Sequence, residues 1–440
     1  MATPIYPPGY YAILRAFLAI FGRSPSVLRW VTAGAIATIC AAVSLASGRA
    51  RRDAWLLFAP AIFLGFFSSV IYSGAPTKPE FLATAFAMVG LALYMRLGFD
   101  ARSRWWLPCC ACAFAAALLV KYTVIGTFVA VTAHLLLRRQ YRQCASFLGI
   151  SLGIVAAIYG TMHILTHGGV YLFTVRANAV SPQLLKVISL GVLGVLPKAF
   201  VVFAVGAAYT LMLRAEDRGA PAVAVALAIF VSLPLAVLAI GKPGSSPFYF
   251  LEPVVLGALA ITLLVRRSYE EANREAASLF PVAALLAMGV IQLPSNLALV
   301  ARREGSPPES AEVRAHVAAL RPAADEFVMA DAYYVFDVAQ AGFTPVMIDN
   351  LVFTLLVDNR VIDDRRLLAL FESGKVPYLV LQNTLEWHAS LAYGGRFYPP
   401  AVVDYLRRNY VCETLMKRWD DAALVICRRS STRSGEGPAR

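Results

Sequence analysis

Residues 221–240 read PAVAVALAIFVSLPLAVLAI, a run of twenty residues without a single charge. An α-helix rises about 1.5 Å per residue, so a run of this length can cross the roughly 30 Å hydrocarbon core of a bilayer. The rest of the chain has a similar character, because 59% of its 440 residues are hydrophobic and only 15% are charged. Soluble domains average about 25% charged residues. The composition therefore excludes an ordinary soluble enzyme and a disordered chain, and it indicates a polytopic membrane protein.

Nine further apolar runs lie before and after this stretch. The candidate spans are about 28–48, 55–74, 80–97, 106–120, 122–137, 144–163, 190–213, 221–240, 247–265 and 277–299. The segment 106–137 is too long for one span and has Lys121 at its centre. Because a charge in the middle of a span is costly, we expect a tight hairpin around Lys121. The sequence thus predicts a mainly α membrane bundle of about ten spans.

Basic residues alternate between the loops that join these spans. One set of loops holds 14 arginines, whereas the opposite set holds five basic residues, which are Lys78, Lys121, Arg176, Lys186 and Lys242. Lys and Arg accumulate in cytoplasmic loops, so we expect the arginine-rich side to face the cytoplasm. The net charge of the chain is +13. Because the basic residues sit in loops between spans and not along one folded face, nucleic acid is not an expected partner.

Both ends of the chain are then expected outside the cytoplasmic (inner) membrane, and the membrane bundle comprises residues 28–302. Residues 1–27 are predicted to be a periplasmic segment with an interfacial helix over 8–22, and the alternative is a weak extra span. Of the 27 acidic residues, 18 lie from Glu304 onward. This change in composition predicts a water-soluble periplasmic domain over 303–430, followed by a disordered tail over 431–440.

The pattern of the periplasmic domain is α/β. Short apolar runs at 327–330, 345–349 and 378–382 predict buried strands, and helices are expected over 309–321, 351–358, 364–372 and 400–409. Two apolar runs flank Asp420-Asp421, which indicates a β-hairpin. Cys412 and Cys427 fall nearly opposite each other in this hairpin, so they are candidates for a disulfide in an oxidising compartment.

Cysteine and histidine spacing does not predict a metal site. Cys109, Cys110 and Cys112 lie together without the second ligand pair that a zinc site needs, so ordinary packing is the simpler interpretation. The sequence also lacks the glycine-rich nucleotide-binding motifs and the nucleophile elbow of hydrolases.

The charge-poor outer side nevertheless carries charged and polar residues at the membrane edge. Charges in this position are candidates for function, although each one alone could simply extend to the lipid headgroups. As a set they suit a lipid-linked phosphate: cations neutralise the phosphate, and a carboxylate could hold a divalent metal or act as a base. We therefore predict that Lys78, Lys121, Arg176 and Lys242 bind phosphate, supported by Glu80, Tyr122, Asn178, Tyr249 and Glu252.

Several weak motifs occur in an order that is moderately specific. They are YPPGYYAILRAFLAIFG at 6–22, RWVTAG at 29–34, ALLVKYT at 117–123, the outer-loop Asn178, GKPG at 241–244, FYFLEP at 248–253 and LRRNY at 406–410. In this order and topology the chain resembles the GT-C superfamily of polytopic glycosyltransferases, specifically the bacterial branch of protein-mannosyltransferase-like and aminoarabinose-transferase-like enzymes. The resemblance covers nearly the whole chain.

This resemblance implies transfer of a sugar from a polyprenyl-phosphate donor to a lipid acceptor or to a periplasmic glycan or protein. In the family, the catalytic acid lies in a first outer loop that precedes the Pro-Pro motif, but no acidic residue precedes Asp53 here. Either the chain lacks its first span and catalytic loop, or it catalyses by another route, so the catalytic residue stays unassigned. A lipid-sugar or small-solute transporter and a non-catalytic membrane scaffold remain alternative functions.

Overall fold

The computed structural model describes the chain in segments that include most of the helices and strands. These segments are residues 6–22, 25–48, 59–64, 78–97, 105–176, 183–197, 203–204, 220, 222–242, 245, 247–271, 309–323, 325–331, 334, 338–339, 341–347, 354, 357, 363–389, 398–417 and 423–430. The chain forms two compact units. The first lies within Tyr6–Thr174 and Val180–Ala301, and the second is mainly Arg302–Arg440. Each unit is described by itself.

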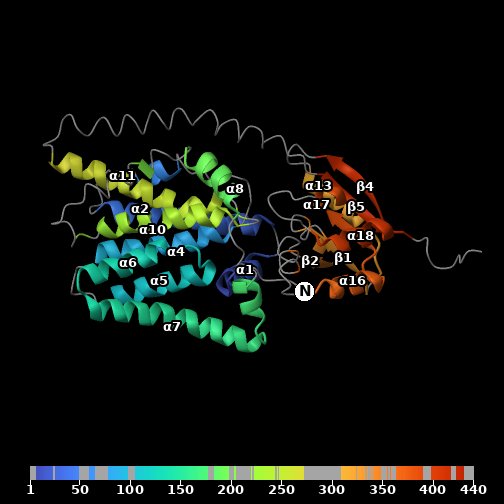
Figure 1. Cartoon of the computed structure of the whole chain (residues 1–440), viewed down its shortest axis with the longest axis horizontal. Coiled ribbons are helices and arrows are strands. Elements are labelled where there is room, and N and C mark those ends of the chain that lie inside the picture. The colour runs from blue at the N-terminus through green and yellow to red at the C-terminus, as the bar shows by residue number, and fades with distance from the viewer. Residues whose placement is uncertain are drawn as a thin grey trace, which may run out of the picture. The chain divides into compact units, whose positions relative to one another are not determined.

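The first unit is a helix bundle (Figure 1). Its elements are α1 (Pro8–Phe21), α2 (Pro25–Ser47), α4 (Pro79–Leu97), α5 (Trp106–Val120), α6 (Gly126–Leu137), α7 (Tyr141–Leu165), the π-helix η1 (Tyr171–Arg176), α8 (Leu184–Lys186), the π-helix η2 (Val187–Val195), α10 (Ala222–Ile240), the 3₁₀-helix η4 (Pro247–Phe250) and α11 (Leu251–Glu271). The expected helix over 8–22 corresponds to α1, which has a proline in its first turn, where the missing N–H carries no cost.

Four helical segments of the described part are long and apolar enough to cross a membrane. They are Arg29–Ser47, Tyr141–Leu165, Ala222–Ile240 and Pro247–Leu264. The mainly helical membrane fold is thereby supported, whereas the number of ten spans stays a prediction. The expected span at 277–299 lies outside the described residues, as do large parts of those at 55–74 and 190–213.

Side-chain contacts show that α4, α5 and α6 run back and forth. Glu80 at the start of α4 pairs with Lys121 just after α5. At the other end, the ring of Tyr94 on α4 lies 6.1 Å from that of Trp106, the first residue of α5. The hydroxyl of Tyr94 also lies 2.6 Å from Nδ1 of His134, near the end of α6. The chain therefore turns between Val120 and Gly126, where the sequence predicts a hairpin.

These contacts define two ends of the bundle. We call the end that carries Glu80 and Lys121 the site end. The opposite end, which we call the arginine end, is where the guanidinium of Arg96 donates to Leu45 O and that of Arg266 donates to Ser47 O at 2.9 Å. Glu80 and Lys121, two of the residues that the sequence singles out, thus sit at the end away from these arginines.

Small residues allow the helices to approach closely, as is common in membrane proteins. A Cβ on Gly126, the first residue of α6, would lie 2.5 Å from the Cβ and 2.9 Å from the Cα of Ser232 on α10. A Cβ on Gly90 of α4 would meet the ring of Phe114 on α5 at 2.8 Å. Glycine is thus required at both crossings, and the crossing at Gly126 brings α10 against the start of α6.

Replacing Gly126 with alanine is expected to destabilise the bundle by about 1–3 kcal/mol, because the added methyl group overpacks the contact with Ser232. Gly153→Ala on α7 is the matched control, since a Cβ there meets nothing within 4 Å. Thermal unfolding of both variants in detergent measures the difference. Equal melting temperatures for the two variants would contradict the close contact of α6 with α10.

The second unit contains a five-stranded sheet of β1 (Phe327–Ala330), β2 (Thr344–Met347), β3 (Tyr378–Leu381), β4 (Tyr410–Lys417) and β5 (Ala423–Arg429). The strand order is β2-β1-β3-β5-β4. Strand β1 is parallel to both β2 and β3, whereas β5 is antiparallel to β3 and to β4. The observed β2 starts one residue before the expected strand over 345–349.

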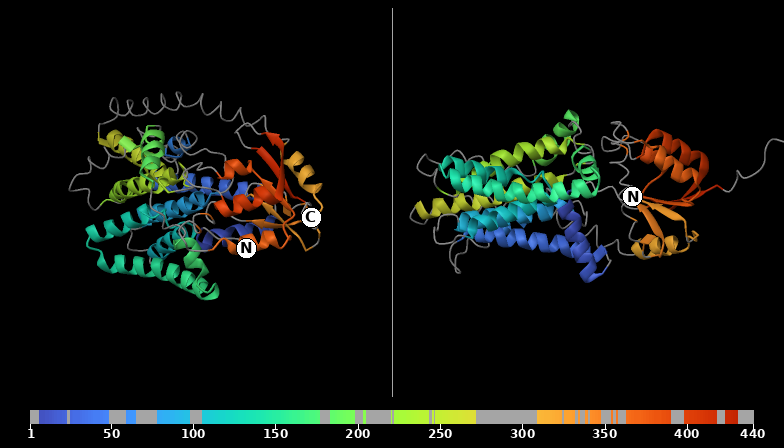
Figure 2. Two further views of the ribbon diagram at one scale, coloured as in Figure 1. Left: turned by 45° about the vertical axis from the view of Figure 1, so that its right-hand side comes forward. Right: turned by 90° about the horizontal axis from the view of Figure 1, so that it is seen from below.

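Helices cover both faces of this sheet (Figure 2). They are α13 (Glu309–Ala318), α16 (Arg365–Glu372), α17 (Leu385–Ala389) and α18 (Pro400–Asn409). Alternate strand residues separate into two cores: Leu379 and Cys427 pack with α16, α17 and α18, while Val380 and Ile426 pack with α13. The expected helix over 309–321 ends at Ala318, and the one over 351–358 lies largely outside the described residues.

The two C-terminal strands form the hairpin that the sequence indicates. Cys412 on β4 lies directly opposite Cys427 on β5, and the structure joins the two in a disulfide. The side chain of Cys427 is buried among the core residues beneath α18. The crosslink thus fastens the outermost strand β4 to the rest of the sheet.

Candidate functional site

An ion pair occupies the site end of the bundle. Glu80 lies in the first turn of α4, directly after Pro79, and the positive end of the helix dipole favours a carboxylate there. Lys121 follows the last residue of α5, and its backbone N–H caps that helix by donating to Ala117 O. The ammonium of Lys121 donates to Oε1 of Glu80, and the side chains are only 6% and 4% exposed. Because α4 and α5 are antiparallel, the start of α4 lies beside the end of α5, and this brings the two charges together.

Two aromatic rings complete the surroundings of Lys121. Its Nζ lies 4.3 Å from the ring centroid of Tyr249, in η4, and 5.4 Å from that of Tyr6, which precedes α1. Both rings can interact with the ammonium through their π faces. The ammonium of Lys121 therefore interacts with the carboxylate of Glu80 and with two tyrosine rings. A phosphate could contact this ammonium only in competition with Glu80.

A second buried carboxylate lies close by. Glu252 is in the first turn of α11, and its Oε1 accepts hydrogen bonds from the backbone N–H of Thr127 at 2.8 Å and from the Thr127 hydroxyl at 2.6 Å. Thr127 is the second residue of α6, so Glu252 also neutralises part of the positive end of that helix dipole. This contact fastens the start of α11 to the start of α6.

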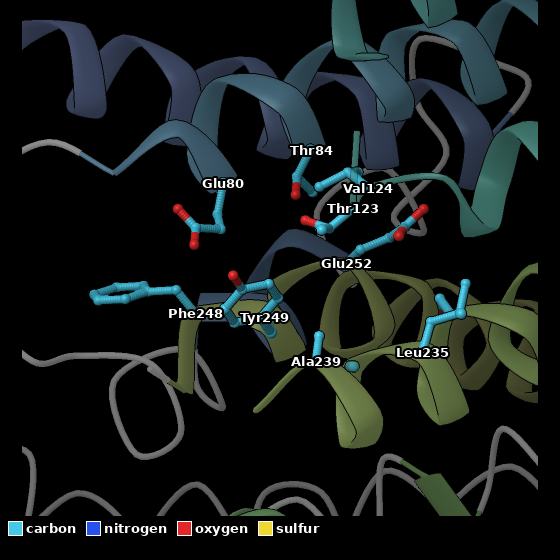
Figure 3. A pocket seen from close by; sticks show the side chains of 11 residues that line it. Glu80, Thr84, Thr123, Val124, Leu235, Ala239, Phe248, Tyr249 and Glu252 are labelled. Carbon is cyan, nitrogen blue, oxygen red and sulfur yellow. The ribbon is translucent and has the colours of Figure 1, made fainter. Parts of the chain in front are cut away.

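A small pocket lies between these groups (Figure 3). Glu80 and Thr84 face it from α4, while Tyr249 and Glu252 face it from the opposite side. Its remaining lining residues are Thr123, Val124, Ser232, Leu235, Ala236, Ala239 and Phe248. The space open to the centre of a water molecule is about 10 Å³, which is close to the minimum that holds one water.

Two further lysines lie at the site end. Lys242 comes shortly after α10, and Lys186 donates from its ammonium to Lys242 O at 2.7 Å and to Ser245 O at 3.4 Å. Burial lowers the pKa of both lysines, and the charge of Lys121 lowers the pKa of Lys242 further. Lys186 therefore holds the loop that carries Lys242, while Lys242 adds its own charge close to Lys121.

The structure thus brings together only some of the residues that the sequence predicts. Lys121, Glu80 and Tyr249 are in direct contact, and Lys78 lies 5.9 Å from the ring of Phe248, which lines the same pocket. Tyr122 follows Lys121 and is partly buried. Arg176 is the last residue of η1, but its side chain lies outside the described part, and so does all of Asn178. The phosphate-binding role of these residues stays a prediction.

Several polar residues of the site were not predicted. Thr84 and Ser232 line the pocket, Thr127 binds Glu252, and Tyr6 covers Lys121. Two of them leave a signal in the sequence: Thr84 follows Glu80 by one helical turn, and Ser232 is the single polar side chain in the run 221–240. Among the described residues, no group of three or more His, Cys, Asp or Glu side chains forms a metal cluster.

Comparison with known proteins supports the fold alone. No protein-family model matches the sequence, and no curated protein matches it. One solved structure to which the chain is similar is that of ArnT from Cupriavidus metallidurans bound to undecaprenyl phosphate, with a TM-score of 0.58 and 15% sequence identity. The match covers 98% of this chain and 89% of the ArnT chain. The chain therefore shares the fold of this ArnT structure.

Proposed function

We propose that the chain is a membrane glycosyltransferase of the GT-C type. It transfers a sugar from a polyprenyl-phosphate-linked donor to a lipid, or to a glycan or protein of the cell envelope. The fold likeness to ArnT, whose structure contains undecaprenyl phosphate, supports this proposal. The finer assignment to the bacterial branch of protein-mannosyltransferase-like and aminoarabinose-transferase-like enzymes rests on the sequence motifs.

The observation that carries the proposal is the clustering of ammonium groups at the site end. Lys121 and Lys242 are close enough for their charges to interact, and Lys186 holds the backbone of Lys242. A monoanionic or dianionic phosphate would relieve the repulsion between these lysines. The lipid tail of a polyprenyl phosphate would extend along the apolar helices, as expected for a donor that reaches its enzyme from the bilayer.

The proposed reaction needs such charges where a phosphate leaves. A nucleophilic oxygen or nitrogen of the acceptor forms a bond to the anomeric carbon, and the bond from that carbon to the phosphate oxygen breaks. The electron pair stays on the polyprenyl phosphate, while the acceptor proton passes to a base. Lysines that are already in place stabilise the growing negative charge without a large reorganisation. With the arginine end in the cytoplasm, the transfer takes place on the outer side of the inner membrane.

A turnover assay tests this function. The purified full chain, reconstituted in liposomes, is supplied with polyprenyl-phosphate sugars extracted from the membranes in which it is made, together with their acceptor fraction. We expect time-dependent release of free undecaprenyl phosphate and a labelled acceptor. Transport of the lipid-linked sugar across the liposome membrane without its cleavage would contradict the proposal and favour a transporter. An inert protein would instead favour a scaffold.

A further inference from the structure

The second unit contains a hollow of about 270 Å³ that the proposed function does not use. Residues of α17, α18, β4 and β5 line it, and these four elements are labelled in Figure 1. Sites for drug-sized ligands measure about 300–1,000 Å³. The hollow lies just below this range, so its size suits a small molecule or one unit of a larger one.

The hollow lies at the carboxyl end of strand β3. Val425 pairs with Leu381, the last residue of β3, and Thr414 pairs in turn with Val425. The chain that leaves β3 continues through Thr384 into α17. Strand β3 is parallel to β1, and open α/β sheets bind their ligands outside the carboxyl ends of the parallel strands. The hollow is therefore at the edge of the sheet where this kind of fold places ligand sites.

The two helices on this face leave part of β4 uncovered. Tyr410 and Thr414 point to the same face, because side chains alternate along a strand. Helix α18 ends at Asn409, directly before Tyr410, and α17 has only five residues. Tyr410 is consequently buried in the core, whereas Thr414 is exposed. The hollow thus results from the lengths of the two helices.

The rim of the hollow carries an ion pair. Nε of Arg407, in the last turn of α18, lies 3.6 Å from Oε1 of Glu386 on α17, and the side chains are 45% and 69% exposed. The guanidinium also lies 3.9 Å from Asp404. Both distances exceed the length of a hydrogen bond. The N–H groups of the guanidinium and the oxygens of the carboxylate are therefore available to a ligand.

The floor of the hollow is apolar. Leu385 and Val425 line it, and both are buried members of the core beneath α18. The hydroxyls of Thr384 and Thr414 add polar groups around this floor. An apolar surface with a few polar groups that fix the orientation is typical of small-molecule sites. A sugar ring matches this arrangement, because its C–H face is apolar and its edge carries hydroxyls.

The charges of the rim select an uncharged ligand. The single cation, Arg407, faces two carboxylates, those of Glu386 and Asp404. An anion would have to compete with both carboxylates for the guanidinium. A neutral polyol has no such cost, since its hydroxyls can accept hydrogen bonds from the guanidinium and donate to the carboxylate in the same complex.

We propose that this hollow binds one uncharged sugar unit. Arg407 donates to the sugar hydroxyls, Glu386 accepts from them, and the ring lies over Leu385 and Val425. The inference goes beyond the proposed function, because it concerns a binding site of the second unit and includes no step of glycosyl transfer.

Saturation-transfer NMR of the purified full chain tests the site, in a detergent without a sugar headgroup such as lauryldimethylamine oxide. The probes are the methyl glycosides of glucose, mannose and N-acetylglucosamine. We expect saturable binding of at least one of them. Permethylated glucose is expected not to bind, because it keeps the ring but has no hydroxyl to donate to Glu386.

Matched variants locate the bound sugar. Arg407→Met and Glu386→Gln are each expected to weaken its binding about tenfold, because each removes a charge-assisted hydrogen bond. Arg365→Met is the first control, since Arg365 is an exposed arginine paired with Asp363 outside the hollow. Glu413→Gln is the second control, because Glu413 is exposed on the opposite face of β4. Both controls are expected to bind the sugar like the parent chain.

Three outcomes would overturn the proposal. None of the three glycosides binds, or Arg407→Met and Glu386→Gln bind them as tightly as the controls, which would place the sugar elsewhere on the chain. In the third outcome, sodium phosphate displaces the glycoside at constant ionic strength, which would assign the hollow to an anion. The liposome assay of transfer is separate from this titration, so failure of the sugar site is distinguishable from failure of the proposed function.

Discussion

Lys121→Met is expected to lower the free energy of unfolding by about 3–5 kcal/mol, because it leaves Glu80 as a buried carboxylate without its counter-ion. The side chains of Lys121 and Glu80 are 6% and 4% exposed, so water cannot replace the lost partner. Methionine fills a similar volume, which limits the effect of a cavity. Thermal and urea-induced unfolding of the full chain in detergent measures the loss.

The double variant Lys121→Met/Glu80→Gln separates the ion pair from packing. Removing both charges is expected to recover most of the lost stability, because a buried pair contributes little beyond the mutual compensation of its charges. Arg365→Met is the exposed control, since its pair with Asp363 lies at the surface with side-chain exposures of 87% and 56%. If the double variant were as unstable as the sum of the single variants, the two charges would not be coupled.

Lys242→Gln is expected to weaken binding of undecaprenyl phosphate about 10- to 100-fold, because a charge-assisted hydrogen bond to a phosphate contributes about 1.5–3 kcal/mol. The substitution removes the charge but keeps a polar side chain of similar length. Native mass spectrometry or a fluorescence titration of the reconstituted chain measures the affinity. Lys375→Gln is the control, because Lys375 is an exposed lysine in the second unit. Equal affinities for the two variants would exclude Lys242 from the phosphate site.

The same interaction gives a pH dependence with a defined sign. Burial and the nearby charge of Lys121 lower the pKa of Lys242 below its ordinary value of 10.5. Only the protonated ammonium attracts phosphate, so the affinity is complete well below this lowered pKa and falls as the pH rises through it. Lys242→Arg keeps its charge in this range and is expected to remove the decline. A pH profile that is the same for lysine and arginine would assign the decline to another group.

Apolar periodicity and loop charge predict much of the bundle because both are local properties of the sequence. The turn at Lys121 follows from the cost of a charge inside a span, and the polar residues at the site end follow from the contrast between the two sets of loops. The apolar run over 80–97 predicts α4 (Pro79–Leu97), and the observed helix starts only one residue earlier than predicted. The strands around 327–330 and 378–382 are found for the same reason.

The interior of the site could not be predicted, because it depends on how each helix is rotated about its axis. Ser232 is one polar residue in a run of apolar ones, and its hydroxyl reaches the pocket only because Gly126 lets α6 and α10 touch. Tyr6 approaches Lys121 from a segment that is distant in sequence. Such contacts depend on how the helices pack against one another. The hydrophobic pattern of a single helix carries no information about this packing.

An experimental structure of the full chain with undecaprenyl phosphate tests the central claim most directly. We expect the phosphate to lie at the site end, within hydrogen-bonding distance of the ammonium of Lys242 or of Lys121, with the polyprenyl chain along the apolar helices. A phosphate bound at the opposite end of the bundle, beside Arg96 and Arg266, would contradict both the proposed site and the side of the membrane on which it acts.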